Sequence, residues 1–169
     1  MLKIIGVCLI LCGAGGFGVA KAMQFYRQLR QLRDCGSALE ILKCELNYTL
    51  MPLPRICRET ASRVKAPVAQ LLSLYANKLD NELPRTKAAA QAIEETRGLT
   101  LPSDAQLALL ELLEGLGRYD LDGENRLLQM STHRLNAALE RIEKEKKPLA
   151  KGYAALGLCT GLALVILLV

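Results

Sequence analysis

The chain contains few residues of the kinds that catalyse reactions or hold metal ions. His133 is the only histidine among 169 residues, and nothing near it in sequence resembles a nucleophile or an orienting partner. A histidine on a helix surface is the simpler interpretation. The six cysteines show no Cys-x-x-Cys or Cys/His spacing suited to zinc. The sequence therefore predicts no catalytic residue, no metal site and no cofactor.

The acidic segment Asp120-Leu-Asp122-Gly-Glu124 resembles the beginning of a calcium-binding loop. It lacks the twelve-residue pattern of oxygen ligands that such a loop requires. An acidic residue before a helix is also a common N-cap. We therefore interpret the segment as a turn followed by the start of a helix.

A glycine-rich segment, Gly13-Ala-Gly15-Gly16-Phe-Gly18, matches the GxGxxG outline of a dinucleotide-binding turn. That turn needs a sheet of parallel strands, and no later β-branched run could supply one. Small residues four positions apart also let membrane helices approach closely. We therefore predict that glycines in both terminal runs pack against other membrane helices, namely Gly15, Gly18, Gly157 and Gly161.

Two uncharged apolar runs, residues 4–20 and 152–169, lie at the ends of the chain. A bilayer core about 30 Å thick needs roughly 17–25 apolar residues in a helix, so each run is long enough to cross. We expect a transmembrane helix over residues 1–22, a helical-bundle domain over residues 23–150, and a second transmembrane helix over residues 151–169. Neither run contains an ionisable residue of the kind that marks an intramembrane active site.

Basic residues flank both runs on the side of the middle domain. They are Lys21, Arg27, Arg30 and Arg33 after the first run, and Arg141, Lys144, Lys146, Lys147 and Lys151 before the second. The positive-inside rule then places the middle domain in the cytoplasm, and anionic lipid headgroups would attract these side chains. No basic face interleaved with aromatic residues suggests nucleic-acid binding.

The N-terminal run allows a second interpretation. Ala20-Lys21-Ala22 has the small-x-small form of a signal-peptidase site after an apolar segment. Cleavage there would leave an exported domain held by its C-terminal run. The middle cysteines, Cys35, Cys44 and Cys57, are odd in number and do not resemble a disulfide framework. We therefore favour an uncleaved anchor.

The middle of the chain divides at prolines and polar breaks into about six helices, and no strong strand pattern occurs. New helices are expected near Pro54, Pro67, Pro84 and Pro102, and a last one near residues 120–122. Pro148 should kink or break that last helix. The predicted fold is an all-α, small antiparallel helical bundle flanked by one transmembrane helix at each end.

One helix mixes polar groups into an apolar stripe and ends at a proline turn. From the residues alone, an amphipathic helix with its charges in water is the favoured interpretation, and contact of these side chains with a partner is the alternative. The candidate residues are Leu39, Leu42, Glu45, Tyr48, Pro52 and Leu53.

These residues, followed by Leu116-Gly117-x-x-Asp120 and a glycine-containing C-terminal run, resemble the stage III sporulation protein AB family over essentially the whole chain. The resemblance implies similarity to the inner-membrane platform protein of type II secretion systems and type IV pili. It also implies a place in the channel-like apparatus between mother cell and forespore, in the mother-cell membrane. The implied partners are a cytoplasmic secretion-type ATPase, stage III sporulation protein AA, and other membrane components of that apparatus.

The expected function is therefore a non-enzymatic scaffold that couples an ATPase to membrane parts, with the lipid bilayer as a further partner and no small-molecule substrate. The alternative is a membrane-anchored regulatory module that uses the same bundle to bind a soluble cytosolic protein. An exposed apolar patch without affinity for an ATPase would favour that alternative.

Overall fold

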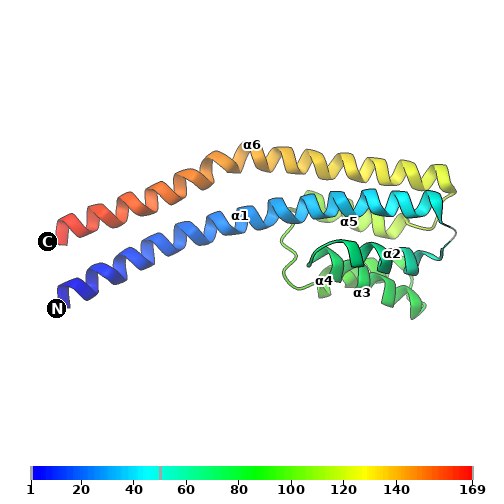
Figure 1. Cartoon of the computed structure of the whole chain (residues 1–169), viewed down its shortest axis with the longest axis horizontal. Coiled ribbons are helices and arrows are strands. Elements are labelled where there is room, and N and C mark those ends of the chain that lie inside the picture. The colour runs from blue at the N-terminus through cyan, green and yellow to red at the C-terminus, as the bar shows by residue number, and fades with distance from the viewer. Residues whose placement is uncertain (1, 50, 169) are drawn as a thin grey trace. The chain divides into compact units, whose positions relative to one another are not determined.

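The computed structural model describes the backbone of residues 2–49 and 51–168, and the side chains of residues 20, 23–49 and 51–144. This part of the chain is all-α, and it contains no strand. Its six helices are α1 (Leu2–Tyr48), α2 (Leu53–Arg63), α3 (Val68–Asp80), α4 (Arg85–Glu95), α5 (Ser103–Gly115) and α6 (Leu121–Leu168). Figure 1 shows their order along the chain.

Each of the four short helices begins directly after a proline. The residues before α2, α3, α4 and α5 are Pro52, Pro67, Pro84 and Pro102. Proline fixes φ near a helical value and lacks the N–H that a helix start leaves unpaired, so it suits this position. The predicted starts of these four helices are confirmed, as is the start of the last helix near residue 121.

The first and last helices differ from the prediction, because the terminal runs are not separate helices. α1 continues from Leu2 to Tyr48, and α6 continues from Leu121 to Leu168. α6 does not end at Pro148, so a break at that residue is wrong. A proline inside a helix removes one intrahelical hydrogen bond, and α6 continues through residue 148 despite that loss.

The chain divides into two compact units. One comprises residues 1–29 with 140–169, and the other comprises residues 30–139. In the first unit, Phe25, Leu29 and Ile142 are buried. Among residues with described side chains, no helix is long and apolar enough to cross a membrane. The two predicted transmembrane runs, with Gly15, Gly18, Gly157 and Gly161, lie outside those residues.

The unit of residues 30–139 has an aliphatic core. α2, α3, α4 and α5 pack in sequence order, each against the next. Its largest fully buried side chains are mostly leucines, and every helix except α4 contributes at least one side chain to this set; α4 contributes buried alanines. Tyr75 is the buried aromatic residue of this core, and its hydroxyl donates a 2.6 Å hydrogen bond to the Leu113 carbonyl, linking α3 to α5.

A buried amide connects α1 to the loop between α4 and α5. The Gln31 Nε2 donates to the Gly98 carbonyl at 2.7 Å, and its Oε1 accepts from the Thr100 backbone N–H at 2.8 Å. A buried amide needs both kinds of partner, because an unmade hydrogen bond would cost about 1–3 kcal/mol. Gln31 therefore fixes how this loop lies against α1.

The two core thiols should make stability depend on alkaline pH. Cys35 and Cys57 are free and buried, and burial raises the pKa of each thiol from 9.0 to about 12. Between these values the unfolded chain loses protons that the folded chain keeps. The free energy of unfolding should therefore fall as pH rises above 9.0, by up to about 1.4 kcal/mol per pH unit for each thiol.

Urea unfolding of a fragment of residues 23–144 measures this dependence. The free energy of unfolding is compared at about pH 8 and about pH 10, which lie on either side of the pKa of an unfolded thiol. The Cys57→Ala variant should lose part of the slope, whereas Cys44→Ala, at an exposed position, should keep it. Equal slopes for the parent and Cys57→Ala would contradict the assignment.

Candidate partner-binding surface

The two leucines of the predicted contact motif belong to the core. Leu39 is 2% exposed and Leu42 is 1% exposed. Both lie on the face of α1 that is turned toward the rest of the helical unit. Because both side chains are buried, neither is available on the surface of this unit, and the accessible part of the motif lies further along the chain.

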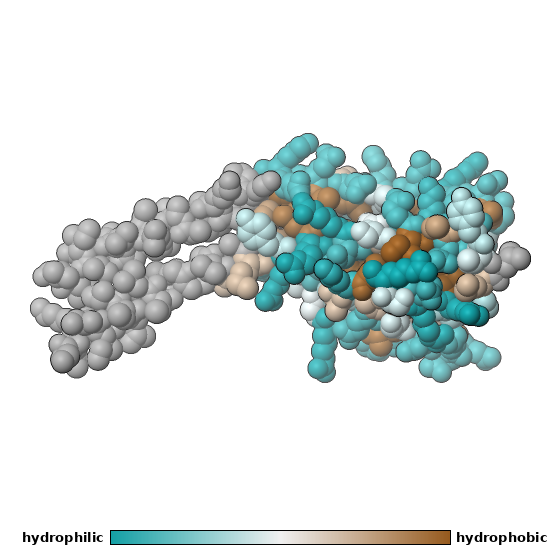
Figure 2. Space-filling model, viewed as in Figure 1, coloured by the Kyte–Doolittle hydropathy of each residue, from teal (hydrophilic) through white to brown (hydrophobic). Residues whose placement is uncertain are grey.

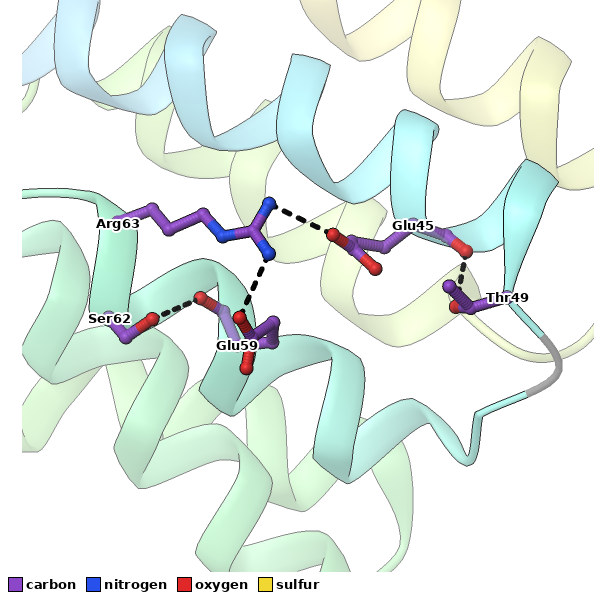
Figure 3. Close-up of polar contacts among 5 residues, drawn as sticks. All are labelled: Glu45, Thr49, Glu59, Ser62 and Arg63. Atoms are coloured by element: carbon purple, nitrogen blue, oxygen red, sulfur yellow. Dashed lines mark hydrogen bonds and ion pairs between the residues drawn. The ribbon is translucent and has the colours of Figure 1, made fainter.

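Glu45 joins α1 to α2. Its Oε1 lies 3.0 Å from Arg63 Nη1, and Arg63 Nη2 also bonds Glu59 Oε1 at 2.9 Å within α2 (Figure 3). The Glu45 side chain is only 12% exposed. The backbone carbonyl of Glu45 accepts a 2.6 Å hydrogen bond from the Thr49 hydroxyl, at the end of α1. Glu45 thus helps to position the first connection of the bundle.

The remaining three motif residues lie at that connection. Tyr48 is the last residue of α1 and is 85% exposed. Pro52 is exposed, and Leu53, the first residue of α2, is half-buried. Of the six predicted contact residues, Tyr48 and Pro52 therefore offer the most surface to a partner.

The structure brings the two sequence motifs together. Gly117 has a φ of +75°, and a Cβ added to it would lie 3.3 Å from Leu53 Cδ2 and 3.4 Å from Arg85 Nη2. Leu116 beside it is buried. The turn between α5 and α6 therefore packs close to the first residues of α2 and α4.

A buried carboxylate holds this turn. Glu124 Oε1 accepts hydrogen bonds from the backbone N–H groups of Gly117, Arg118 and Tyr119 at 2.7, 3.0 and 3.1 Å. Asp120 Oδ1 accepts the N–H of Gly123 at 3.1 Å, as a helix N-cap does. The sequence indicated the turn and the helix start, but it gave no sign that Glu124 reaches back over it.

Two glycines allow a matched test of these backbone roles. Gly117→Ala should destabilise the residue 23–144 fragment by about 1–2 kcal/mol, because alanine is strained at positive φ. Gly36 lies inside α1, where an added Cβ meets nothing within 4 Å. Gly36→Ala should stabilise the fragment by about 0.5–1 kcal/mol. Urea midpoints measure both, and a shift in the same direction for the two variants would contradict this interpretation.

A groove follows the junction of α1 and α6. The Asn47 and Asn125 side-chain amides exchange two hydrogen bonds of 2.9 Å across it. Two adjoining pockets, of about 590 and about 630 Å³, open along these helices and share Glu40 and Lys43. The remaining lining residues are Cys44, Asn47, Tyr48, Asn125, Arg126, Gln129, Met130, Thr132, His133 and Asn136.

Of the residues that line this groove, the sequence motif of candidate contact residues includes only Tyr48. The helix pattern shows which residues of one helix share a face, but not which helix lies beside it. His133, exposed on α6, lines the groove. On the face drawn in Figure 2, the coloured residues are mostly hydrophilic, with a smaller hydrophobic area among them.

Three comparisons with known proteins, by family model, by sequence and by structure, each match this chain to stage III sporulation protein AB. A family model described as stage III sporulation protein AB matches residues 3–169. Stage III sporulation protein AB of Bacillus subtilis (strain 168) is 26% identical over 170 residues, which cover 99% of each protein. A solved structure of a stage III sporulation protein AB matches with a TM-score of 0.65 and 23% identity, over 72% of this chain and 98% of the solved chain. That structural match bears on the fold alone.

Proposed function

Because the chain belongs to the stage III sporulation protein AB family, we propose that it is a non-enzymatic membrane scaffold of the sporulation channel. Both ends are anchored in the mother-cell membrane that faces the forespore, and the bundle between them lies in the cytoplasm. The bundle binds a secretion-type ATPase, stage III sporulation protein AA, and couples it to membrane components of the apparatus.

The continuity of two helices carries this proposal. α1 and α6 each include part of the compact unit of residues 30–139 and then continue through the uncharged apolar runs at the ends of the chain. Runs of this length and composition are suited to a bilayer. The basic residues beside them favour a cytoplasmic bundle.

A scaffold of this kind does not need to make or break covalent bonds. Displacement of the bundle by an ATPase would pass into the membrane along two helices that have no break between Leu2 and Tyr48 or between Leu121 and Leu168. Rigid secondary elements are among the carriers of coupling between distant sites. The exposed Tyr48 and the adjoining groove supply a surface for the partner.

Affinity purification tests the proposal. The tagged full-length chain is extracted in mild detergent from membranes of its own sporulating cells, with a tagged unrelated membrane protein as the control. The expected result is co-purification of the secretion-type ATPase with the tagged chain only. Recovery without an ATPase or any membrane partner would contradict the scaffold function, and recovery of a soluble cytosolic protein in their place would favour the regulatory module.

A further inference from the structure

The groove between α1 and α6 combines exposed apolar side chains with unpaired charges. Met130 lines one of its pockets and is 58% exposed, and Tyr48 lines the other. Leu121, also exposed, lies one helical turn before Asn125 on α6. Exposed tyrosine and large apolar side chains gathered on one surface are typical of protein-binding sites.

The charges of the groove favour an acidic partner. Lys43 and Arg126 form no ion pair with any residue whose side chain is described, while other cations of the same unit, such as Arg58 and Arg134, do. Glu40 is the single carboxylate of the groove. Two cations and one anion give the lining of the groove an excess of positive charge.

The dimensions of the groove suit a helix. Its α6 wall extends from Asn125 to Asn136, which is about 16 Å or three helical turns at 1.5 Å per residue. The side-chain amides of Asn125, Gln129 and Asn136 line this wall, and they can donate and accept hydrogen bonds. A valley between two packed helices can receive a third helix by the usual ridge-into-groove packing.

We infer that this groove binds an amphipathic helix of a partner protein, about three turns long, whose apolar side chains contact Tyr48 and Met130 and whose carboxylates pair with Lys43 and Arg126. The inference rests on the proposed scaffold function and identifies the surface and the chemistry of its contact. Leu39 and Leu42 are buried and do not line the groove, so neither contacts the partner.

Site-specific photo-crosslinking tests the inference in the full-length chain, in membranes of its own sporulating cells. A photoreactive amino acid replaces Gln129, which lines the groove, or Gln70, which is exposed on α3. The crosslinked segment of the partner is then sequenced. The expected product forms from position 129 and not from position 70, and the captured segment carries acidic residues along an amphipathic helical pattern.

Charge reversal provides the second measurement. The double variant K43E/R126E should reduce crosslinking from position 129 by roughly tenfold or more. K65E/R97E, at exposed positions away from the groove, applies the same change in net charge and should leave crosslinking intact. Circular dichroism of both variants establishes that each is folded, so a loss of crosslinking reports on contact.

The other outcomes separate this inference from the scaffold function. Crosslinks from position 129 to a basic or neutral segment, or to a second copy of this chain, would overturn the inference. Crosslinks from position 70 alone would also overturn it, but they would leave the scaffold function in place. No crosslink from either position, together with no ATPase in the affinity purification, would overturn both.

Discussion

Replacing Leu42 with alanine is expected to lower the free energy of unfolding of the residue 23–144 fragment by about 2–5 kcal/mol. The Leu42 side chain is 1% exposed and is among the largest fully buried side chains of the core. Removing its terminal carbons forfeits their transfer free energy and leaves a cavity that the neighbouring helices fill only in part. Urea unfolding followed by circular dichroism measures the change.

Tyr48→Ala is the matched control, since Tyr48 lies on the same helix and in the same motif but is exposed. It should change the free energy of unfolding by no more than about 0.5 kcal/mol. A Leu42→Ala fragment as stable as the parent would show that Leu42 is not a core residue. A large loss in Tyr48→Ala would show that its ring packs within the unit.

Glu124→Ala is expected to destabilise the same fragment by about 2–3 kcal/mol. It removes the shared acceptor of three backbone N–H groups in the turn before α6, and hydrogen bonds to a charged group contribute more than neutral ones. The cost is limited because Gly117, Arg118 and Tyr119 are exposed, so water can reach some of the freed donors.

Two further variants define the cause. Glu124→Gln keeps one acceptor oxygen and loses the charge, so it should be less destabilising than Glu124→Ala. Glu40→Ala removes an exposed carboxylate and should remain within about 0.5 kcal/mol of the parent. Equal stability of Glu124→Ala and Glu40→Ala would mean that Glu124 does not hold the turn.

The sequence predicted the short helices well because their boundaries are local. Proline determines where a helix can begin regardless of tertiary context, and four helices of the structure start directly after Pro52, Pro67, Pro84 and Pro102. The turn before α6 was equally predictable from the sequence, because an acidic residue preceding a helical pattern is a local signal.

The long helices were less predictable because no local signal ends a helix between each apolar terminal run and the amphipathic segment beside it. Between residue 20 and Tyr48 the chain contains no proline, and a single glycine such as Gly36 does not end a helix. The change from an apolar to an amphipathic pattern suggested two separate helices. Backbone hydrogen bonding does not depend on this change in side-chain polarity, so one helix can continue through both segments.

The motif of candidate contact residues shows a second limit of prediction from sequence. An apolar stripe on a helix has the same pattern whether it packs into its own core or against another protein. Only the tertiary structure assigns Leu39 and Leu42 to the core and leaves Tyr48 exposed. The groove between α1 and α6 depends on a contact between residues far apart in sequence, which the Asn47–Asn125 pair reveals.

Labelling of Cys44 tests most directly whether the bundle lies inside a membrane that anchors both ends. Among the cysteines of the described part, Cys44 alone is exposed, while Cys35 and Cys57 are buried. In vegetative cells, a full-length variant that keeps only Cys44 should react with a membrane-impermeant maleimide after permeabilisation but not before. A cysteine added after Val169 should react in intact cells. Labelling of Cys44 from outside intact cells would contradict the topology and the scaffold function that depends on it.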